Sequence, residues 1–145
     1  YMLYECNATK VRLEKEIGYI RHFISLNLLK DSRGLNVNFD CGEIPDHLEI
    51  APMLLIPLVE NAFKHSKFED KANGWINIKL QLLGESLHLS VQNSLPDKSH
   101  TTDNTGGIGL VNVRRQLELI YPEQFQLSIN EQDQVFSVDL IIEKL

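Results

Sequence analysis

The sequence predicts a two-layer α/β sandwich: a mixed, mostly antiparallel sheet of about five strands with three main helices on one of its faces. Segments with the three- and four-residue spacing of amphipathic helices are interleaved with segments whose apolar residues alternate with period two. Two of the alternating segments are separated only by a short turn, which is typical of an antiparallel hairpin. At 145 residues and 43% apolar composition, the chain is large enough for one domain with its own hydrophobic core.

The first helix is predicted over residues 11–31, with Gly34 ending it. The segment that follows, residues 35–40, alternates like a strand. The apolar side chains expected on the buried face of the helix recur at steps of three and four residues: Leu13, Ile17, Ile20, Ile24 and Leu28.

The second helix is predicted from Pro52, which suits the first position of a helix, to about residue 66. Pro57 inside it lacks a backbone donor and is predicted to kink it. On a helical wheel, one arc faces the core and the adjacent arc is polar. The core arc holds Leu55, Leu58, Val59 and Ala62, and the adjacent arc holds Pro57, Glu60, Asn61 and Lys64.

Residues 75–83 and 86–92 form the predicted hairpin, and strand parity places Asn93, at its end, on the buried face. A third helix is predicted over residues 109–121, and Pro122 closes it. Its apolar face holds Leu110, Val113, Leu117 and Ile120. A strand pair over residues 125–129 and 135–142 completes the fold.

The bulk composition excludes several classes of function. A formal net charge of -6 offers no basic surface for nucleic acid, so no nucleic-acid partner is expected. Cys6 and Cys41 match no metal-ligand spacing and are expected to be free thiols in a reducing compartment. No apolar run approaches the ~20 residues that span a bilayer, and the chain shows no signal peptide. Because it begins at Tyr1, we expect it to be part of a longer protein.

The segment "PLVENAFKHS", residues 57–66, places Glu60, Asn61, Lys64 and His65 in an otherwise apolar helix. An amide between a carboxylate and an ammonium suits a magnesium–phosphate ligand, because Mg²⁺ prefers oxygen donors and Lys offers a charge to phosphate. An ordinary surface helix would show the same partition of polar and apolar residues. This segment alone leaves both interpretations open.

Three glycines, Gly106, Gly107 and Gly109, lead into the third helix in the segment "TGGIGLVNV", residues 105–113. Glycines let backbone N–H groups approach a phosphate closely, and the N-terminus of a helix favours an anion. The dinucleotide fingerprint does not fit, because its third glycine would fall at Asn112, and the chain contains no P-loop motif. The alternative is a plain glycine turn before a helix.

The segment between Asn93 and these glycines, residues 94–106, is long and polar, which predicts a functional loop such as a mobile lid. Asn93 itself is expected to be buried, and a buried amide requires a hydrogen-bond partner. Either another protein group or the base of a bound ligand satisfies it, and the residues alone leave these two alternatives open.

Together these segments resemble the ATP-binding domain of GHKL proteins, which has the Bergerat fold. Within that superfamily the chain looks like the LytS-like subclass of two-component sensor histidine kinases. The resemblance rests on "PLVENAFKHS", a strand ending in Asn93, a lid, and "GGIGL" followed by a helix, in that order. Upstream, "LEKEIGYIRHFISLNLL" is similar to the helix that joins the phosphoacceptor hairpin to the catalytic domain in that subclass.

The resemblance implies that residues 1–34 are the tail of the phosphoacceptor hairpin with the joining helix, and that residues 35–145 are the ATP-binding domain. It also implies transfer of the ATP γ-phosphate to a histidine on the upstream hairpin of the same or a partner chain. A response regulator of the LytTR type would then receive the phosphate. The parent would be a homodimer in a bacterial inner membrane, with this domain in the cytoplasm. This chain lacks the acceptor motif, since His22 lies on the joining helix.

For single residues, the resemblance implies that Asn61 binds Mg²⁺ and that Asn93 accepts a hydrogen bond from the adenine 6-amino group. Glu60 and Lys64 complete the catalytic set, with Glu60 tuning the metal or its water and Lys64 facing the phosphates of ATP. His65 is expected to face the phosphates as well. The start of the third helix would admit the triphosphate through Gly107, Ile108, Gly109 and Leu110.

Asn93 departs from the family, which usually carries an Asp at this position. A neutral acceptor in place of a charged one costs ~1 kcal/mol, or roughly five- to tenfold in affinity, so Asn93→Asp is expected to tighten ATP binding. The alternative function is a degenerate module that holds a partner without catalysis. ATP hydrolysis of the gyrase kind is disfavoured, because Pro57 stands one helical turn before Asn61, where those enzymes carry a carboxylate.

Overall fold

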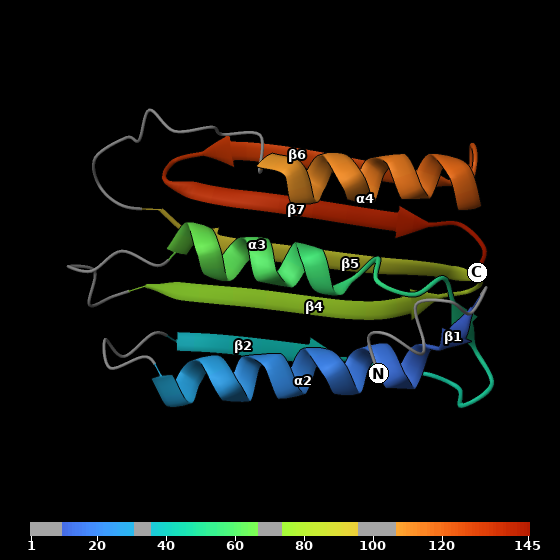
Figure 1. The fold of residues 1–145 in the computed structure, drawn as a ribbon, viewed down its shortest axis with the longest axis horizontal. Helices are drawn as coiled ribbons and strands as arrows, with labels where there is room; N and C mark the ends of the chain where they lie inside the picture. The colour runs from blue at the N-terminus through green and yellow to red at the C-terminus, as the bar shows by residue number, and fades with distance from the viewer. Residues whose placement is uncertain (1–9, 31–35, 67–73, 96–106) are drawn as a thin grey trace.

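The computed structural model describes residues 10–30, 36–66, 74–95 and 107–145, and it has the two-layer α/β architecture that the sequence predicts (Figure 1). The helices are α2 (Leu13–Lys30), α3 (Ile56–Ser66) and α4 (Gly107–Ile120). The strands of the main sheet are β2 (Asn36–Cys41), β4 (Trp75–Leu83), β5 (Ser86–Ser94), β6 (Phe125–Gln132) and β7 (Val135–Ile142).

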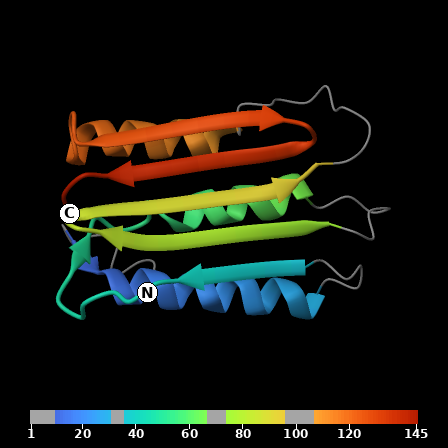
Figure 2. The ribbon, with the colours of Figure 1, turned by 180° about the vertical axis from the view of Figure 1, so that it is seen from behind.

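The five strands lie in the order β2-β4-β5-β7-β6. β2 runs parallel to β4, and the other three neighbouring pairs are antiparallel, so the sheet is mixed and mostly antiparallel as predicted. The three helices cover one face, and the view from behind shows no helix of the described residues on the other face (Figure 2). This one-sided cover explains the period-two alternation of apolar and polar residues along the strands.

The two predicted hairpins form, and their turns contain residues with positive φ. Gly84, between β4 and β5, has a φ of 65°. Asp133 and Gln134, between β6 and β7, have φ values of 55° and 64°. Two consecutive positive φ values are typical of a type I′ turn, whose twist matches that of paired antiparallel strands.

The first helix is shorter than predicted at its N-terminus. Residues 11 and 12 instead form β1 (Val11–Arg12), which pairs with β3 (Glu49–Ile50) in a separate two-stranded sheet. A two-residue strand is too short to show a period, so the sequence pattern did not indicate it. The predicted burial of Leu28 is wrong: its side chain is 40% exposed, because the buried face of α2 ends at Ile24. The predicted stop at Gly34 lies outside the described residues.

The second helix begins at Ile56, not at Pro52. Met53 has a φ of 65°, which is incompatible with a right-handed helix, so residues 52–55 form turns instead. Pro57 is therefore the second residue of α3, where a backbone N–H would have no partner within the helix. The predicted kink at Pro57 is wrong, because no helical hydrogen bond is lost there.

The third helix, α4, places Leu110, Val113 and Leu117 in the core as predicted, but Ile120 is 38% exposed. Tyr121, directly after the helix, is buried instead, and its hydroxyl oxygen accepts a hydrogen bond of 3.1 Å from the Ala51 N–H. This bond joins the end of α4 to the segment that precedes α3.

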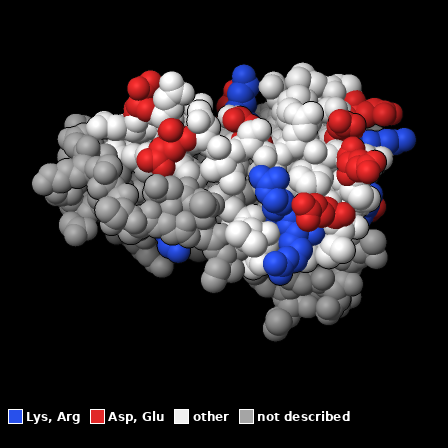
Figure 3. All heavy atoms as spheres, turned by 90° about the horizontal axis from the view of Figure 1, so that it is seen from above, with Lys and Arg blue, Asp and Glu red and all other residues white. Residues whose placement is uncertain are grey.

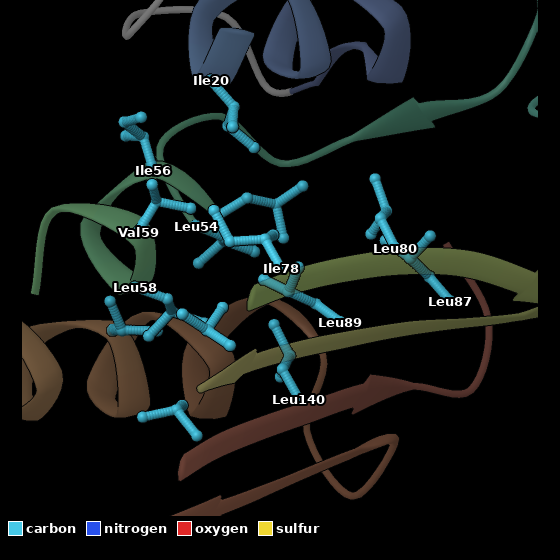
Figure 4. Close-up of a cluster of buried hydrophobic side chains, with 14 of the residues drawn as sticks. Ile20, Leu54, Ile56, Leu58, Val59, Ile78, Leu80, Leu87, Leu89 and Leu140 are labelled. Carbon is cyan, nitrogen blue, oxygen red and sulfur yellow. The ribbon is translucent and has the colours of Figure 1, made fainter. Parts of the chain in front are cut away.

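One hydrophobic core fills the space between the helices and the sheet (Figure 4). Residues of α2 belong to the same cluster as those of α3 and the strands, while a domain division at residues 34 and 35 stays a prediction. The side chains that line this layer in Figure 4 include Ile20 from α2, Leu58 and Val59 from α3, Ile78 and Leu80 from β4, Leu89 from β5 and Leu140 from β7.

Candidate functional site

Three elements that carry predicted site residues meet at one end of the molecule. α3 packs against β4, β5 and α4. The C-terminal ends of α3 and β5 and the N-terminal end of α4 lie at the same end of the fold, on the left of Figure 1. The topology therefore gathers three segments that are well separated in the sequence.

Asn93 is buried at the end of β5, with 1% of its surface exposed, as the strand parity predicts. Its side-chain Nδ2 donates a hydrogen bond of 2.9 Å to the backbone oxygen of Ser94. The other side-chain atom, Oδ1, is buried and has no hydrogen-bond partner among the described residues. A buried acceptor without a partner is uncommon in folded proteins and indicates a place for a donor.

Asn61 is also buried, with 7% of its surface exposed, although the helical wheel placed it in a polar arc. Its Nδ2 is buried without a hydrogen-bond partner in the described part of the chain. Glu60 and Lys64 in the same arc are exposed. The residues of this polar arc differ in burial because α3 packs against α4 as well as against the sheet. The contact with α4 covers a second side of the helix.

The carboxylate of Glu60 reaches solvent but is partly shielded by the surface around it. This partial loss of hydration disfavours the charged form and raises the pKa of Glu60 above the ordinary value for a glutamate. Lys64, one helical turn further on, leaves an exposed ammonium on the same side of α3. The exposed side of α3 near Asn61 thus combines a carboxylate and an ammonium.

His65 lies half-buried at the end of α3, where its ring stacks on that of Phe136 with a centroid distance of 4.7 Å and an interplanar angle of 23°. Phe136 is the partner of Asn93 across the β5–β7 pair. Through this stack, the imidazole of His65 lies next to the cross-strand partner of Asn93. The predicted role of His65 toward phosphates stays a prediction.

Ser94 and Phe136 contact predicted site residues but were not themselves predicted. The sequence did contain a signal for Phe136. The alternation of apolar residues over 135–142 places Phe136 on the inner face of its strand, and pairing that strand with β5 places Phe136 beside Asn93. The contact of Ser94 involves its backbone carbonyl, which a pattern of side chains does not reveal.

Gly107, Ile108 and Gly109 form the first turn of α4, two residues earlier than predicted. The first N–H groups of a helix have no partner within it. A Cβ at Gly109 would meet no other heavy atom within 4 Å, so packing in this structure does not require a glycine there. The side chain of Leu110 is only 2% exposed and packs in the core. Gly106 and the predicted lid over residues 96–106 lie outside the described residues.

The described residues contain no group of three or more His, Cys, Asp or Glu side chains that could hold a metal ion. No helix in the part of the chain that the structure describes has both the length and the apolar character of a membrane span. Cys41 is a free thiol as predicted, and Cys6 lies outside the described residues.

Seen from the side of α4 and β6, acidic and basic side chains are interspersed on the surface (Figure 3).

No protein-family model matches the chain. The chain is similar to the sensor protein kinase HptS of Staphylococcus aureus strain USA300, with 29% identity over 85 residues. This match covers 59% of the chain and 16% of HptS, so the chain corresponds to a small part of that relative. The HptS proteins of strains COL and N315 show the same identity over the same length.

Solved structures of histidine kinases share the fold. The catalytic domain of the histidine kinase ThkA aligns over 94% of this chain and 96% of its own, with a TM-score of 0.66 and 19% identity. ThkA in complex with the response regulator protein TrrA gives a TM-score of 0.64 at 18% identity, covering 94% of this chain and 42% of that one. Full-length ShkA in complex with AMPPNP gives 0.65 at 14% identity, covering 94% and 31%. The chain therefore has the fold of histidine kinase catalytic domains.

Proposed function

We propose that this chain is the ATP-binding catalytic domain of a sensor histidine kinase of the LytS-like type. The observation that carries the proposal is the buried Oδ1 of Asn93, which has no hydrogen-bond partner among the described residues. An acceptor at the end of β5 suits the 6-amino group of adenine. The similarity to HptS and the shared fold support the same function.

Asn61 fits a role in binding Mg²⁺ together with ATP. It is buried on α3, and its Nδ2 has no hydrogen-bond partner in the described part of the chain, so this donor is available to a phosphate oxygen, while the side-chain oxygen would hold the metal. One amide oxygen is enough where the phosphates and water supply the remaining oxygen ligands that Mg²⁺ prefers. When bound, Mg²⁺ supplies positive charge to the phosphates.

The remaining site residues position the triphosphate and neutralise its charge. Lys64 offers an exposed ammonium on α3. The backbone of Gly107 and Gly109 in the first turn of α4 offers N–H groups without helical partners. Leu110 contributes through its backbone, since its side chain is in the core. Glu60 precedes Asn61 on α3, where it would tune the metal or its water.

In the parent protein, these residues would position ATP for transfer of its γ-phosphate to a histidine on the upstream hairpin of the same or a partner chain. Catalysis of phosphoryl transfer depends mainly on such positioning and charge neutralisation. A response regulator of the LytTR type would receive the phosphate. The parent would be a dimer with this domain in the cytoplasm. The alternative, a scaffold without catalytic activity, would leave Asn61 without a metal.

Calorimetric titration of the chain with ATP, in the presence and absence of Mg²⁺, tests this function. We expect micromolar to sub-millimolar binding that tightens with Mg²⁺, and we expect Asn61→Ala to weaken Mg-ATP binding about tenfold or more and to remove the effect of the metal. Asn130→Ala, an exposed amide on β6, is the matched control and should bind as the parent chain does. A folded chain that does not bind Mg-ATP would favour the scaffold.

A further inference from the structure

The amide of Asn93 is held in one orientation. Its Nδ2 lies 2.9 Å from the backbone oxygen of Ser94. Turning the amide by half a rotation would place Oδ1 against that carbonyl, so that two acceptors would face each other without a proton between them. The present orientation keeps the donor on the carbonyl and leaves Oδ1 as the acceptor without a partner in the described part of the chain.

Ser94 is held in place by its own side chain. The Ser94 hydroxyl oxygen accepts a hydrogen bond of 3.0 Å from the Trp75 N–H, and the same hydroxyl lies 3.5 Å from the Trp75 carbonyl oxygen. These contacts join the end of β5 to the start of β4 and restrain the carbonyl that holds the Asn93 amide. Ser94 thus acts on the ligand-binding atom through Asn93 and is a positioning residue.

The surroundings of Asn93 disfavour a charged side chain at this position. Its cross-strand neighbours are Ile76 on β4 and Phe136 on β7, and both are buried. An aspartate there would have an oxygen facing the Ser94 carbonyl and apolar side chains on either side. Burial of an unpaired carboxylate is costly and favours its protonated form.

We infer that the Ser94 carbonyl locks Asn93 as a neutral hydrogen-bond acceptor toward the base of the nucleotide, so that this position is built for an amide and not for a carboxylate. This inference rests on the proposed function, since it concerns the base of the nucleotide that the site binds. It reverses the expectation from residue type alone that Asn93→Asp would tighten ATP binding.

The first test compares Mg-ATP with Mg-ITP on the unaltered chain by calorimetry. ITP carries an oxygen at C6, which would face the locked Oδ1 as a second acceptor, so we expect it to bind about tenfold more weakly or worse. Asn93→Ala removes the acceptor and should bind the two nucleotides with similar affinity. Equal affinities for ATP and ITP in the unaltered chain would overturn the inference while leaving nucleotide binding intact.

The second test uses Asn93→Asp at neutral and acidic pH, with the unaltered chain measured under the same conditions. At neutral pH the variant should bind Mg-ATP more weakly than the unaltered chain. The deficit should shrink as the pH falls, because protonation gives the side chain a donor for the Ser94 carbonyl and leaves an acceptor for the base. Tighter binding by Asn93→Asp at neutral pH would contradict the inference.

Ser94→Ala tests the positioning step, and Ser90→Ala is its control on the same strand and with the same parity. We expect Ser94→Ala to lower the ratio of ATP to ITP affinity and Ser90→Ala to leave the ratio unchanged. A Ser94→Ala variant that loses stability but keeps the full ratio would show a structural role only. If neither ATP nor ITP binds the folded chain, the proposed function itself fails.

Discussion

At the scale of single residues, two buried amides mark the site. Asn61 on α3 and Asn93 on β5 each bury one polar atom without a partner in the described part of the chain. Leaving a buried polar atom unpaired costs ~1–3 kcal/mol, and an apolar residue of similar size would avoid that cost. These residues therefore lower the stability of the ligand-free chain, and a ligand that pairs with them regains it.

Glu60 gives a prediction about pH. Its pKa is raised in the folded chain by partial desolvation, so the folded state binds the proton more tightly than the unfolded state does. The free energy of unfolding should therefore fall as the pH rises from the ordinary glutamate range through the raised pKa of Glu60. Glu60→Gln should unfold like the parent chain at acidic pH and be slightly more stable at neutral pH.

The measurement is urea unfolding of both chains without nucleotide at a series of pH values. Glu85→Gln, an exposed carboxylate in the β4–β5 turn, corrects for the loss of one negative charge. A stability difference between Glu60→Gln and the parent chain that grows toward acidic pH would contradict the prediction.

At the scale of elements, the position of α3 depends on how the helix begins. The turns over residues 52–55 and the positive φ of Met53 delay its start to Ile56, so Pro57 falls in the first turn. The bond from the Ala51 N–H to Tyr121 joins this start to the end of α4. The C-terminal half of α3, with Asn61, Lys64 and His65, is thereby directed toward the ends of β5 and β7.

Pro57→Ala tests this assignment. Because no helical hydrogen bond is missing at Pro57, the substitution should lower the free energy of unfolding by less than ~1 kcal/mol, through greater freedom of the unfolded chain. Lys64→Pro, at an exposed position within the helix, should lower it by about 3 kcal/mol or more. Urea unfolding measures both. A gain of stability in Pro57→Ala would indicate that the proline strains the helix after all.

At the scale of the whole molecule, α2 and the sheet share one core. Leu13, Ile17 and Ile20 of α2 belong to the hydrophobic cluster that also contains Ile78 and Leu80 of β4. This shared burial predicts that α2 unfolds together with the sheet, because removing the helix would expose apolar side chains on both.

Ile20→Ala tests this coupling. The side chain is fully buried, so we expect a loss of about 2–5 kcal/mol in the free energy of unfolding. The fluorescence of Trp75, the single tryptophan, and the far-ultraviolet circular dichroism should shift together. Leu29→Ala, at a position 84% exposed, is the control and should change stability by less than ~0.5 kcal/mol. An unchanged Trp75 transition in Ile20→Ala would mean that α2 is a separate unit.

Periodicity alone predicted the class of the fold, the order of its main elements and most of the core, because a helix or strand with one buried face repeats its apolar residues with the period of its backbone. It failed at Leu28 and Ile120, whose spacing fits the apolar face but which lie in the last turns of their helices, where that face is no longer covered. It also missed β1 and β3, which are too short to show a period.

By itself, the sequence determined that polar residues interrupt an apolar helix, that Asn93 ends a strand on its buried face, and that glycines precede the third helix. Only the tertiary structure decided that Asn61 is buried while Glu60 and Lys64 are exposed, that His65 stacks on Phe136, and that the Asn93 amide is turned toward the Ser94 carbonyl. The physical reason is that a local repeat specifies which face of an element is apolar. Burial and hydrogen bonding of a polar side chain depend on which distant segments pack against it.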